Sequence, residues 1–201
     1  MSYSDFTLKK VKSAFDLEII ETQSLFADIP SIPLSDYLTK TLERNVPLAL
    51  SINTEKARSE LIIINVLLEL KDQLDQKISL FSGIDFSVDK EKGLAGFCDY
   101  IVSASSEQLY LEKPVVTIVE AKNENIVSGL GQCIAEMYAA QIFNQNEQEK
   151  VDAVLGLVTT GSEWRFIQLT NNIVHVDRDL YSINQVEKII GILVKRLLDI
   201  H

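Results

Sequence analysis

Three residues at the end of an apolar run, Glu120-Ala121-Lys122, have types and a spacing that suit chemistry. They close residues 114–122, a β-branched and apolar segment that predicts a buried strand. Because side chains on a strand alternate between its two faces, Glu120 and Lys122 project on one side and Ala121 on the other. A carboxylate and an ammonium at the end of a buried strand cost desolvation energy. They therefore either pair with each other or act on a metal and a substrate.

Asp99 is the second candidate, because it interrupts the apolar residues 94–102 and strand interiors disfavour Asp. If Asp99 converges with Glu120, the carboxylate oxygens suit Mg²⁺ or Mn²⁺, which take one or two carboxylates together with waters and substrate phosphate. Lys122 beside such a site would position the attacking water or stabilise charge in the transition state. The alternative is a surface pair between Glu120 and Lys122, which is worth little.

Two helices add further candidates. In the helix predicted over residues 54–76, Glu60 lies at the edge of the apolar stripe and needs a cation, a donor or a metal, while simple pairing with Lys56 is equally consistent. Glu69 falls on the polar face and is expected to be a solvated acid. In the helix predicted over residues 126–143, Gln132 shares a small, polar face with Glu136, from which it reaches a water or a phosphate. A solvated helix face explains Gln132 equally well.

The helices and strands that must position these residues are predicted from hydrophobic periodicity and from residues that cap or interrupt them. Helices are expected from a cap at Asp5 to about residue 20, from Ser35 to about residue 45 after the two prolines of residues 29–33, and from a cap at Asn53. This order predicts an α/β fold of the mixed α+β kind, a central mixed sheet flanked by helices, in one domain over residues 1–201. Residues 1–50 are a helical extension, 53–169 the core and 183–201 a closing helix. Strands are expected at residues 78–81, 84–88, 94–104, 115–122, 153–159, 164–169 and 173–176, with a polar connector at 144–150.

Composition sets limits on partners. The formal net charge of −10 is unusual for an autonomous nucleic-acid binder, because phosphate binding is driven largely by Lys and Arg. Residues 61–70 form the longest apolar stretch and are too short for a membrane span. Residues 1–15 are polar and carry no secretory pattern, and Cys98 and Cys133 show no metal-ligand spacing, so reduced thiols and a cytoplasmic location are expected.

Taken together, Glu60, Asp99, Glu120-Ala121-Lys122 and Gln132 resemble the PD-(D/E)xK phosphodiesterase superfamily, which has the restriction endonuclease-like fold of restriction enzymes, resolvases and recombination exonucleases. The core of that family is a helix, a three-strand meander, a helix and a strand. Residues 159–166 resemble the strand–turn–strand of the nuclease-type domains of type I restriction subunits, with Thr160 where Asp or Asn is usual. Cys98 stands where the family places a proline before the Asp.

The resemblance implies that Asp99 and Glu120 bind Mg²⁺ or Mn²⁺, that Glu60 is an extra ligand or orienting acid, and that Lys122 activates water. Gln132 matches the helical glutamine of exonuclease-like branches. The implied activity is endo- or exonucleolytic hydrolysis of nucleic acid, DNA more than RNA. Two alternatives stay open: a nuclease-fold binding or scaffold protein without turnover, and an unrelated α/β domain. The apolar closing helix fits a homodimer or protein contact as well as it fits a seal on the core.

Overall fold

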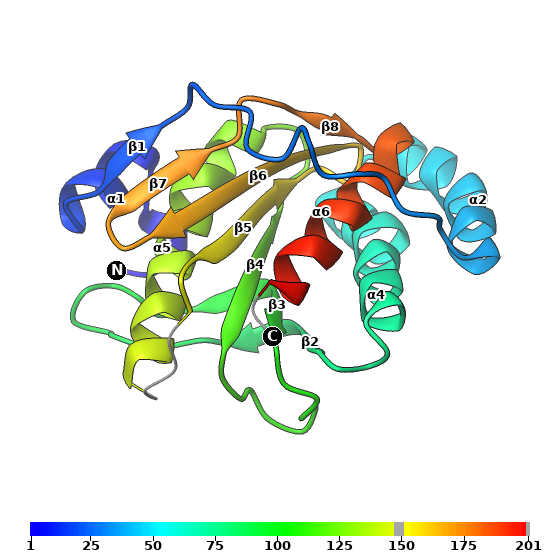
Figure 1. Ribbon diagram of the computed structural model, residues 1–201. Helices are drawn as coiled ribbons and strands as arrows, with labels where there is room; N and C mark the ends of the chain where they lie inside the picture. Colours follow the sequence, from blue (N-terminus) through cyan, green and yellow to red (C-terminus); the bar gives the residue numbers. More distant parts are fainter. Residues whose placement is uncertain (147–150, 200–201) are drawn as a thin grey trace.

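A mixed sheet with helices on both faces forms the centre of the computed structural model, which describes residues 1–146 and 151–199 (Figure 1). The strands are β1 (Glu18–Ile20), β2 (Ser79–Asp85), β3 (Phe97–Ser103), β4 (Val115–Ala121), β5 (Val154–Thr159), β6 (Glu163–Thr170), β7 (Ile173–Val176) and β8 (Tyr181–Ser182). The helices are η1 (Tyr3–Asp5), α1 (Leu8–Ala14), α2 (Asp36–Ile52), α3 (Glu55–Arg58), the π-helical turn η2 (Ser59–Ile63), α4 (Ile64–Gln73), α5 (Ile126–Asn146), η3 (Ile183–Gln185) and α6 (Val186–Leu198).

The strand order β1-β7-β6-β5-β4-β3-β2, with β8 beside β6, contains the predicted core arrangement. Strands β2, β3 and β4 form an antiparallel meander, and β5 returns parallel to β4. A parallel neighbour requires a long crossover, and α5 supplies it. The predicted mixed sheet flanked by helices is therefore confirmed.

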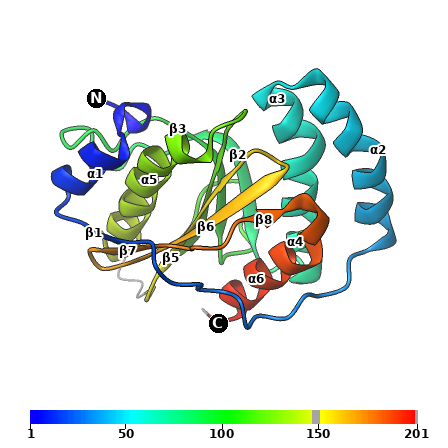
Figure 2. The same cartoon turned by 90° about the horizontal axis from the view of Figure 1, so that it is seen from above.

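The helices form two layers (Figure 2). Helices α1 and α5 lie on one side of the sheet, while α4 and α6 lie on the other with α2 packed outside α4, and each side has its own hydrophobic cluster. Strand β4 is buried at every residue because its side chains point alternately into these two clusters. Among the described residues, no helix combines the length and apolar character that crossing a membrane requires.

The amino-terminal third differs from the sequence prediction. Helix α1 is capped by Thr7 rather than by Asp5, and it ends early because the chain turns at Asp16, with φ 50°, into strand β1. The predicted helical extension thus contributes a strand parallel to β7. Ser35 caps α2 as predicted, but the helix continues to Ile52 through Pro47.

Other boundaries shifted as well. Asn53 ends α2 in a left-handed conformation, φ 53°, and Thr54 rather than Asn53 caps the next helix. The two predicted short strands around Gly83 are one strand, β2, because Gly83 at φ 61° stays within the ladder. The predicted connector at 144–150 begins inside α5. Residues 147–150, and residues 200–201 of the predicted closing helix, lie outside the described residues.

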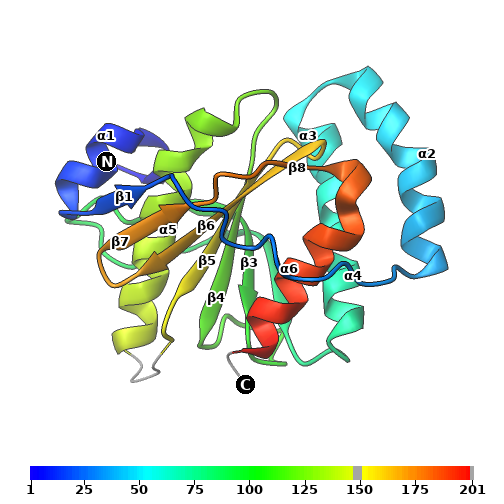
Figure 3. The ribbon, with the colours of Figure 1, turned by 45° about the horizontal axis from the view of Figure 1, so that its top comes forward.

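Residues 21–35 form a strap that crosses from β1 to α2 over the edge of β8 and α6 (Figure 3). The buried carboxylate of Asp177 anchors the strap by accepting a hydrogen bond from the backbone N–H of Leu25 at 3.1 Å and from the hydroxyl of Tyr181 at 3.2 Å. The ammonium of Lys188 donates to the carbonyls of Phe26 and Ala27 at 2.7 and 2.8 Å. These bonds fix where α2 begins.

The prediction that Glu69 is a solvated acid is wrong, since its side chain is only 4% exposed. Its carboxylate accepts hydrogen bonds from the backbone N–H of Ser35 at 2.9 Å, from the Ser35 hydroxyl at 2.6 Å and from Gln73 at 2.9 Å. Glu69 thereby fastens the start of α2 to α4. Helical periodicity along α4 alone cannot reveal this contact, because the strap brings Ser35 there from elsewhere in the chain.

We expect Glu69→Gln to lower the free energy of unfolding by about 1–3 kcal/mol, because it removes a buried, ionised acceptor from the hydrogen bonds of Ser35 and Gln73. Burial raises the pKa of Glu69, but the hydrogen bonds from Ser35 and Gln73 outweigh it and leave the pKa below its ordinary value. Its contribution is therefore present at neutral pH and is lost as the pH falls through the lowered pKa. Urea denaturation at several pH values measures both effects. Glu43→Gln, an exposed α2 control, should change stability by less than about 0.5 kcal/mol.

Candidate active site

Asp99 and Glu120 lie on neighbouring antiparallel strands at the same end of the sheet. The paired part of β3 and β4 ends at Tyr100 and Val119, one residue before Asp99 and Glu120. The carboxylate of Asp99 also accepts a hydrogen bond from the backbone N–H of Ala121 at 2.8 Å. Ile118, two residues before Glu120 on β4, belongs to the hydrophobic cluster under α5, so Glu120 projects on the face that α5 covers. The side chain of Asp99 reaches β4 beside it, and the charge of Asp99 acts on Glu120.

Lys122 follows the last residue of β4 and forms an ion pair with the Oε1 atom of Glu120. The Glu120 side chain is 1% exposed and that of Lys122 is 21% exposed, so one end of the pair reaches solvent. The stem of Lys122 lies across Gly129 of α5, where an added Cβ would come within 3.0 Å of Lys122 Cγ and 2.8 Å of a Val158 methyl. A glycine at this position allows the helix to approach the strand closely.

Glu136 is a site residue that the sequence did not reveal. The small, polar face of α5 is not solvated at this position, because Glu136 is fully buried. The carboxylate of Glu136 accepts a hydrogen bond from the Gln132 amide at 3.0 Å, so this amide group is bound within the site. Helix α5 is covered on its second side by the amino-terminal segment, since a Cβ at Gly131 would lie 2.5 Å from the carbonyl oxygen of Phe6.

Burial and neighbouring charges shift the pKa values of Glu120, Glu136 and Lys122. Burial, and then the charge of Asp99, raise the pKa of Glu120 to about 8, although Lys122 opposes the shift. Burial and the charge of Glu120 raise the pKa of Glu136 well above its ordinary value. Burial lowers the pKa of Lys122, but the Glu120 carboxylate outweighs it and the pKa is raised. The site therefore retains a proton at neutral pH, and added positive charge would release it.

Two carboxylate oxygens in this site are buried without a hydrogen-bond partner among the described residues, Oε2 of Glu120 and Oε2 of Glu136. A buried, unpartnered carboxylate oxygen carries a desolvation cost that a proton or a cation removes. Asp99 and Glu120 supply the hard oxygen ligands that Mg²⁺ and Mn²⁺ prefer. Their oxygens thus fit such an ion chemically.

Glu60 lies apart from this cluster. Its side chain is 62% exposed and pairs with Lys56 at 3.3 Å, within the π-helical turn η2. Across the part of the chain that the structure describes, no group of three or more His, Cys, Asp or Glu residues is arranged to hold a metal ion. The structure thus brings together Asp99, Glu120, Lys122 and Gln132, but not Glu60.

A second cation, Arg58, supports the same end of the sheet and was not recognised in the sequence. Its guanidinium is buried and donates to the carbonyl of Thr160 at 2.8 Å, to the Ser162 hydroxyl at 3.2 Å and to the side-chain oxygen of Asn53 at 2.9 Å. These bonds hold the β5–β6 turn against α3. The backbone N–H of Lys122 in turn donates to Thr159 at 2.8 Å, which continues the β4–β5 ladder to the site.

Comparison of this chain with models of known protein families and with curated proteins finds no match. Inferences about its chemistry therefore rest on the residues and geometry described above.

We expect the unfolding free energy of the metal-free protein to fall as the pH rises from about 4.5 to about 8. The reason is that a carboxyl group whose folded pKa is raised stabilises the fold while it is protonated and loses that contribution as it ionises. Glu120→Gln cannot ionise and should flatten this dependence in urea denaturation series. Glu60→Gln, which removes an exposed carboxylate, should retain the slope of the parent. Equal slopes for the parent and Glu120→Gln would contradict this account of the site.

Proposed function

We propose that this protein is a metal-dependent phosphodiesterase of the PD-(D/E)xK type that hydrolyses nucleic acid, DNA in preference to RNA. The observation that carries the proposal is the convergence of three side chains at one end of the central strands. Asp99 of β3 bonds the backbone of β4 at Ala121, next to Glu120, and Lys122 follows two residues after Glu120 and pairs with it. The meander, the α5 crossover and the parallel β5 that surround them support the same class.

In this proposal Asp99 and Glu120 hold one Mg²⁺ or Mn²⁺, and waters and a substrate phosphate complete its shell, as is usual for these ions. The bound ion supplies charge that polarises the phosphoryl group and lowers the pKa of water. Lys122, now paired with Glu120, would be released to hold the attacking water. Water would attack phosphorus in line and lose a proton to solvent, while the bond to the leaving oxygen breaks and that oxygen takes up a proton.

Glu136 and Gln132 serve this arrangement from the helix side. Glu136 binds the Gln132 amide group, which leaves the amide oxygen of Gln132 for a water near Lys122. Glu60 has no part in the proposed mechanism, because its exposed carboxylate already pairs with Lys56.

Cleavage assays test the chemistry. With Mn²⁺ or Mg²⁺ and a mixture of single- and double-stranded DNA, we expect the parent to hydrolyse phosphodiester bonds and Lys122→Ala to lose about 10²-fold or more in rate, the usual scale of such a contribution. Lys195→Ala is the matched control: Lys195 pairs with Asp199 on α6, across the sheet. Parent-like cleavage by Lys122→Ala would refute the assigned role of this lysine.

A nuclease-fold binding protein without turnover is the second candidate, and the net charge of −10 favours it. Calorimetry with Mn²⁺ separates the two. A metal-dependent enzyme should bind the ion, and Asp99→Asn and Glu120→Gln should each weaken binding about tenfold or more through loss of a ligand. Glu60→Gln should bind as the parent does. Absence of Mn²⁺ binding by the folded parent would favour the scaffold.

A further inference from the structure

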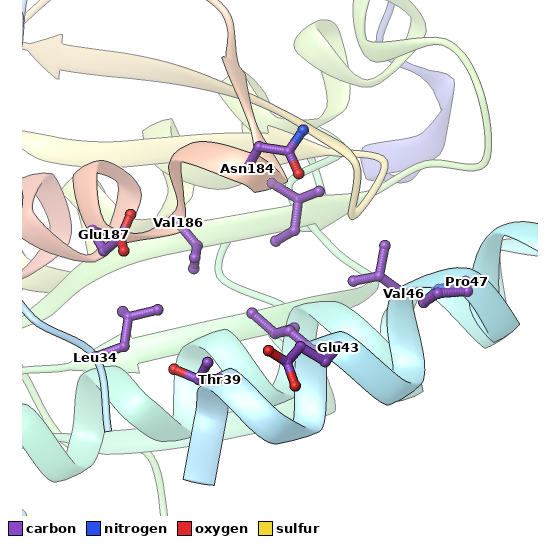
Figure 4. A pocket seen from close by; sticks show the side chains of 10 residues that line it. Leu34, Thr39, Glu43, Val46, Pro47, Asn184, Val186 and Glu187 are labelled. Atoms are coloured by element: carbon purple, nitrogen blue, oxygen red, sulfur yellow. The ribbon is translucent and has the colours of Figure 1, made fainter. Parts of the chain in front are cut away.

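A groove of about 450 Å³ lies between α2 and the start of α6, on the face of the sheet opposite α5 (Figure 4). Its walls are largely apolar: Leu34 from the strap, Val46 from α2 and Val186 from α6 point into it. The carboxylates of Glu43 and Glu187 stand on its two sides. An apolar groove with like charges on both sides predicts a ligand with an apolar surface and charges of the opposite sign.

The groove offers acceptors and negative charge. Among the described residues neither Glu43 nor Glu187 has an ion-pair partner, and no residue that lines the groove is basic. Lys188, next to Glu187, is engaged with the carbonyls of the strap. Pro47 lies inside α2 and has no N–H, so the helix cannot close its usual hydrogen bond on the carbonyl of Glu43. A donor-rich cation such as Lys or Arg matches this set.

The groove continues along α2 beyond the cavity itself. Thr39, Glu43 and Val46 line it at helical spacing, and Leu50, 39% exposed, continues the same stripe by one more turn. From Thr39 to Leu50 the stripe is about 16 Å long at 1.5 Å per residue. This length matches the two to three turns over which an amphipathic helix places its anchors in a groove.

We propose that this groove binds a basic amphipathic helix of a partner protein. Apolar side chains of that helix pack against Leu34, Val46 and Val186, and its Lys or Arg residues reach Glu43 and Glu187. A second copy of this chain is disfavoured as the occupant, because a two-fold contact would set the acidic sides of one copy against those of the other. The groove also lies across the sheet from Asp99 and Glu120, so the proposal does not depend on phosphodiesterase activity.

The probe is a synthetic helical peptide of leucine and lysine with leucines at three- and four-residue spacing, and a matched peptide carries glutamate in place of lysine. In fluorescence anisotropy at physiological ionic strength, the lysine peptide should bind and the glutamate peptide should not. Glu43→Lys and Glu187→Lys should each weaken binding about tenfold or more, as charge reversal at an interface does. Lys122→Ala should bind as the parent does.

Glu91→Lys is the control for net charge, since it changes the charge of the chain equally. Glu91 lies in the turn beside Gly93, which neighbours Met1, and the amino terminus and α2 are at opposite sides of the molecule (Figure 2). Weakening by less than about twofold for Glu91→Lys, with peptide-induced NMR shifts at Val46 and Val186, supports the proposal. Equal weakening by Glu91→Lys, binding of the glutamate peptide, or self-association that Val46→Asp abolishes would each overturn it.

Discussion

The burial of Glu120 near the end of β4 is the constraint on which the rest of the site depends. Strand β4 is buried along its whole length between two hydrophobic clusters, so a carboxylate at its end has little access to water. A charge in that position must be neutralised or paired. Lys122 supplies an ammonium from the same strand, and Gly129 lets α5 approach closely enough to cover that pair. The Glu120–Lys122 ion pair and the close approach of α5 to β4 therefore depend on the same packing.

The same packing makes the site unbalanced in charge. Glu136 is buried beside a second buried acid, although a neutral side chain would cost less at that position. Buried polar groups that are not required for folding concentrate at functional sites, and perturbed carboxyl groups in particular do so. A purely structural Glu120–Lys122 pair would not require Asp99 beside it or an acid on α5. The buried, unpartnered oxygens of Glu120 and Glu136 each need a proton or a cation in addition to Lys122.

The sequence predicts those features of the site that depend on residues close together in the chain. The shared side of Glu120 and Lys122 depends on strand alternation alone, and the adjacency of their strand to that of Asp99 depends on a short antiparallel connection. Both are local. Burial of Glu136 depends on the amino-terminal segment packing over α5, and burial of Glu69 depends on the strap bringing Ser35 to α4. Such contacts join distant parts of the chain, so helical periodicity alone does not reveal that either acid is buried.

The acidity of the chain also constrains the order of events in the proposed chemistry. The raised pKa values of Glu120 and Glu136 keep a proton in the site at neutral pH, and the net charge of −10 opposes the approach of a phosphodiester at long range. In the proposed chemistry Asp99 and Glu120 would hold a divalent ion in place of that proton, and Lys122 would then be free to face the phosphate. The ion would therefore bind before the nucleic acid or together with it. At longer range a basic helix on the opposite face would offset part of the negative charge of the chain. The metal and the partner would then both reduce the repulsion between this chain and a phosphodiester.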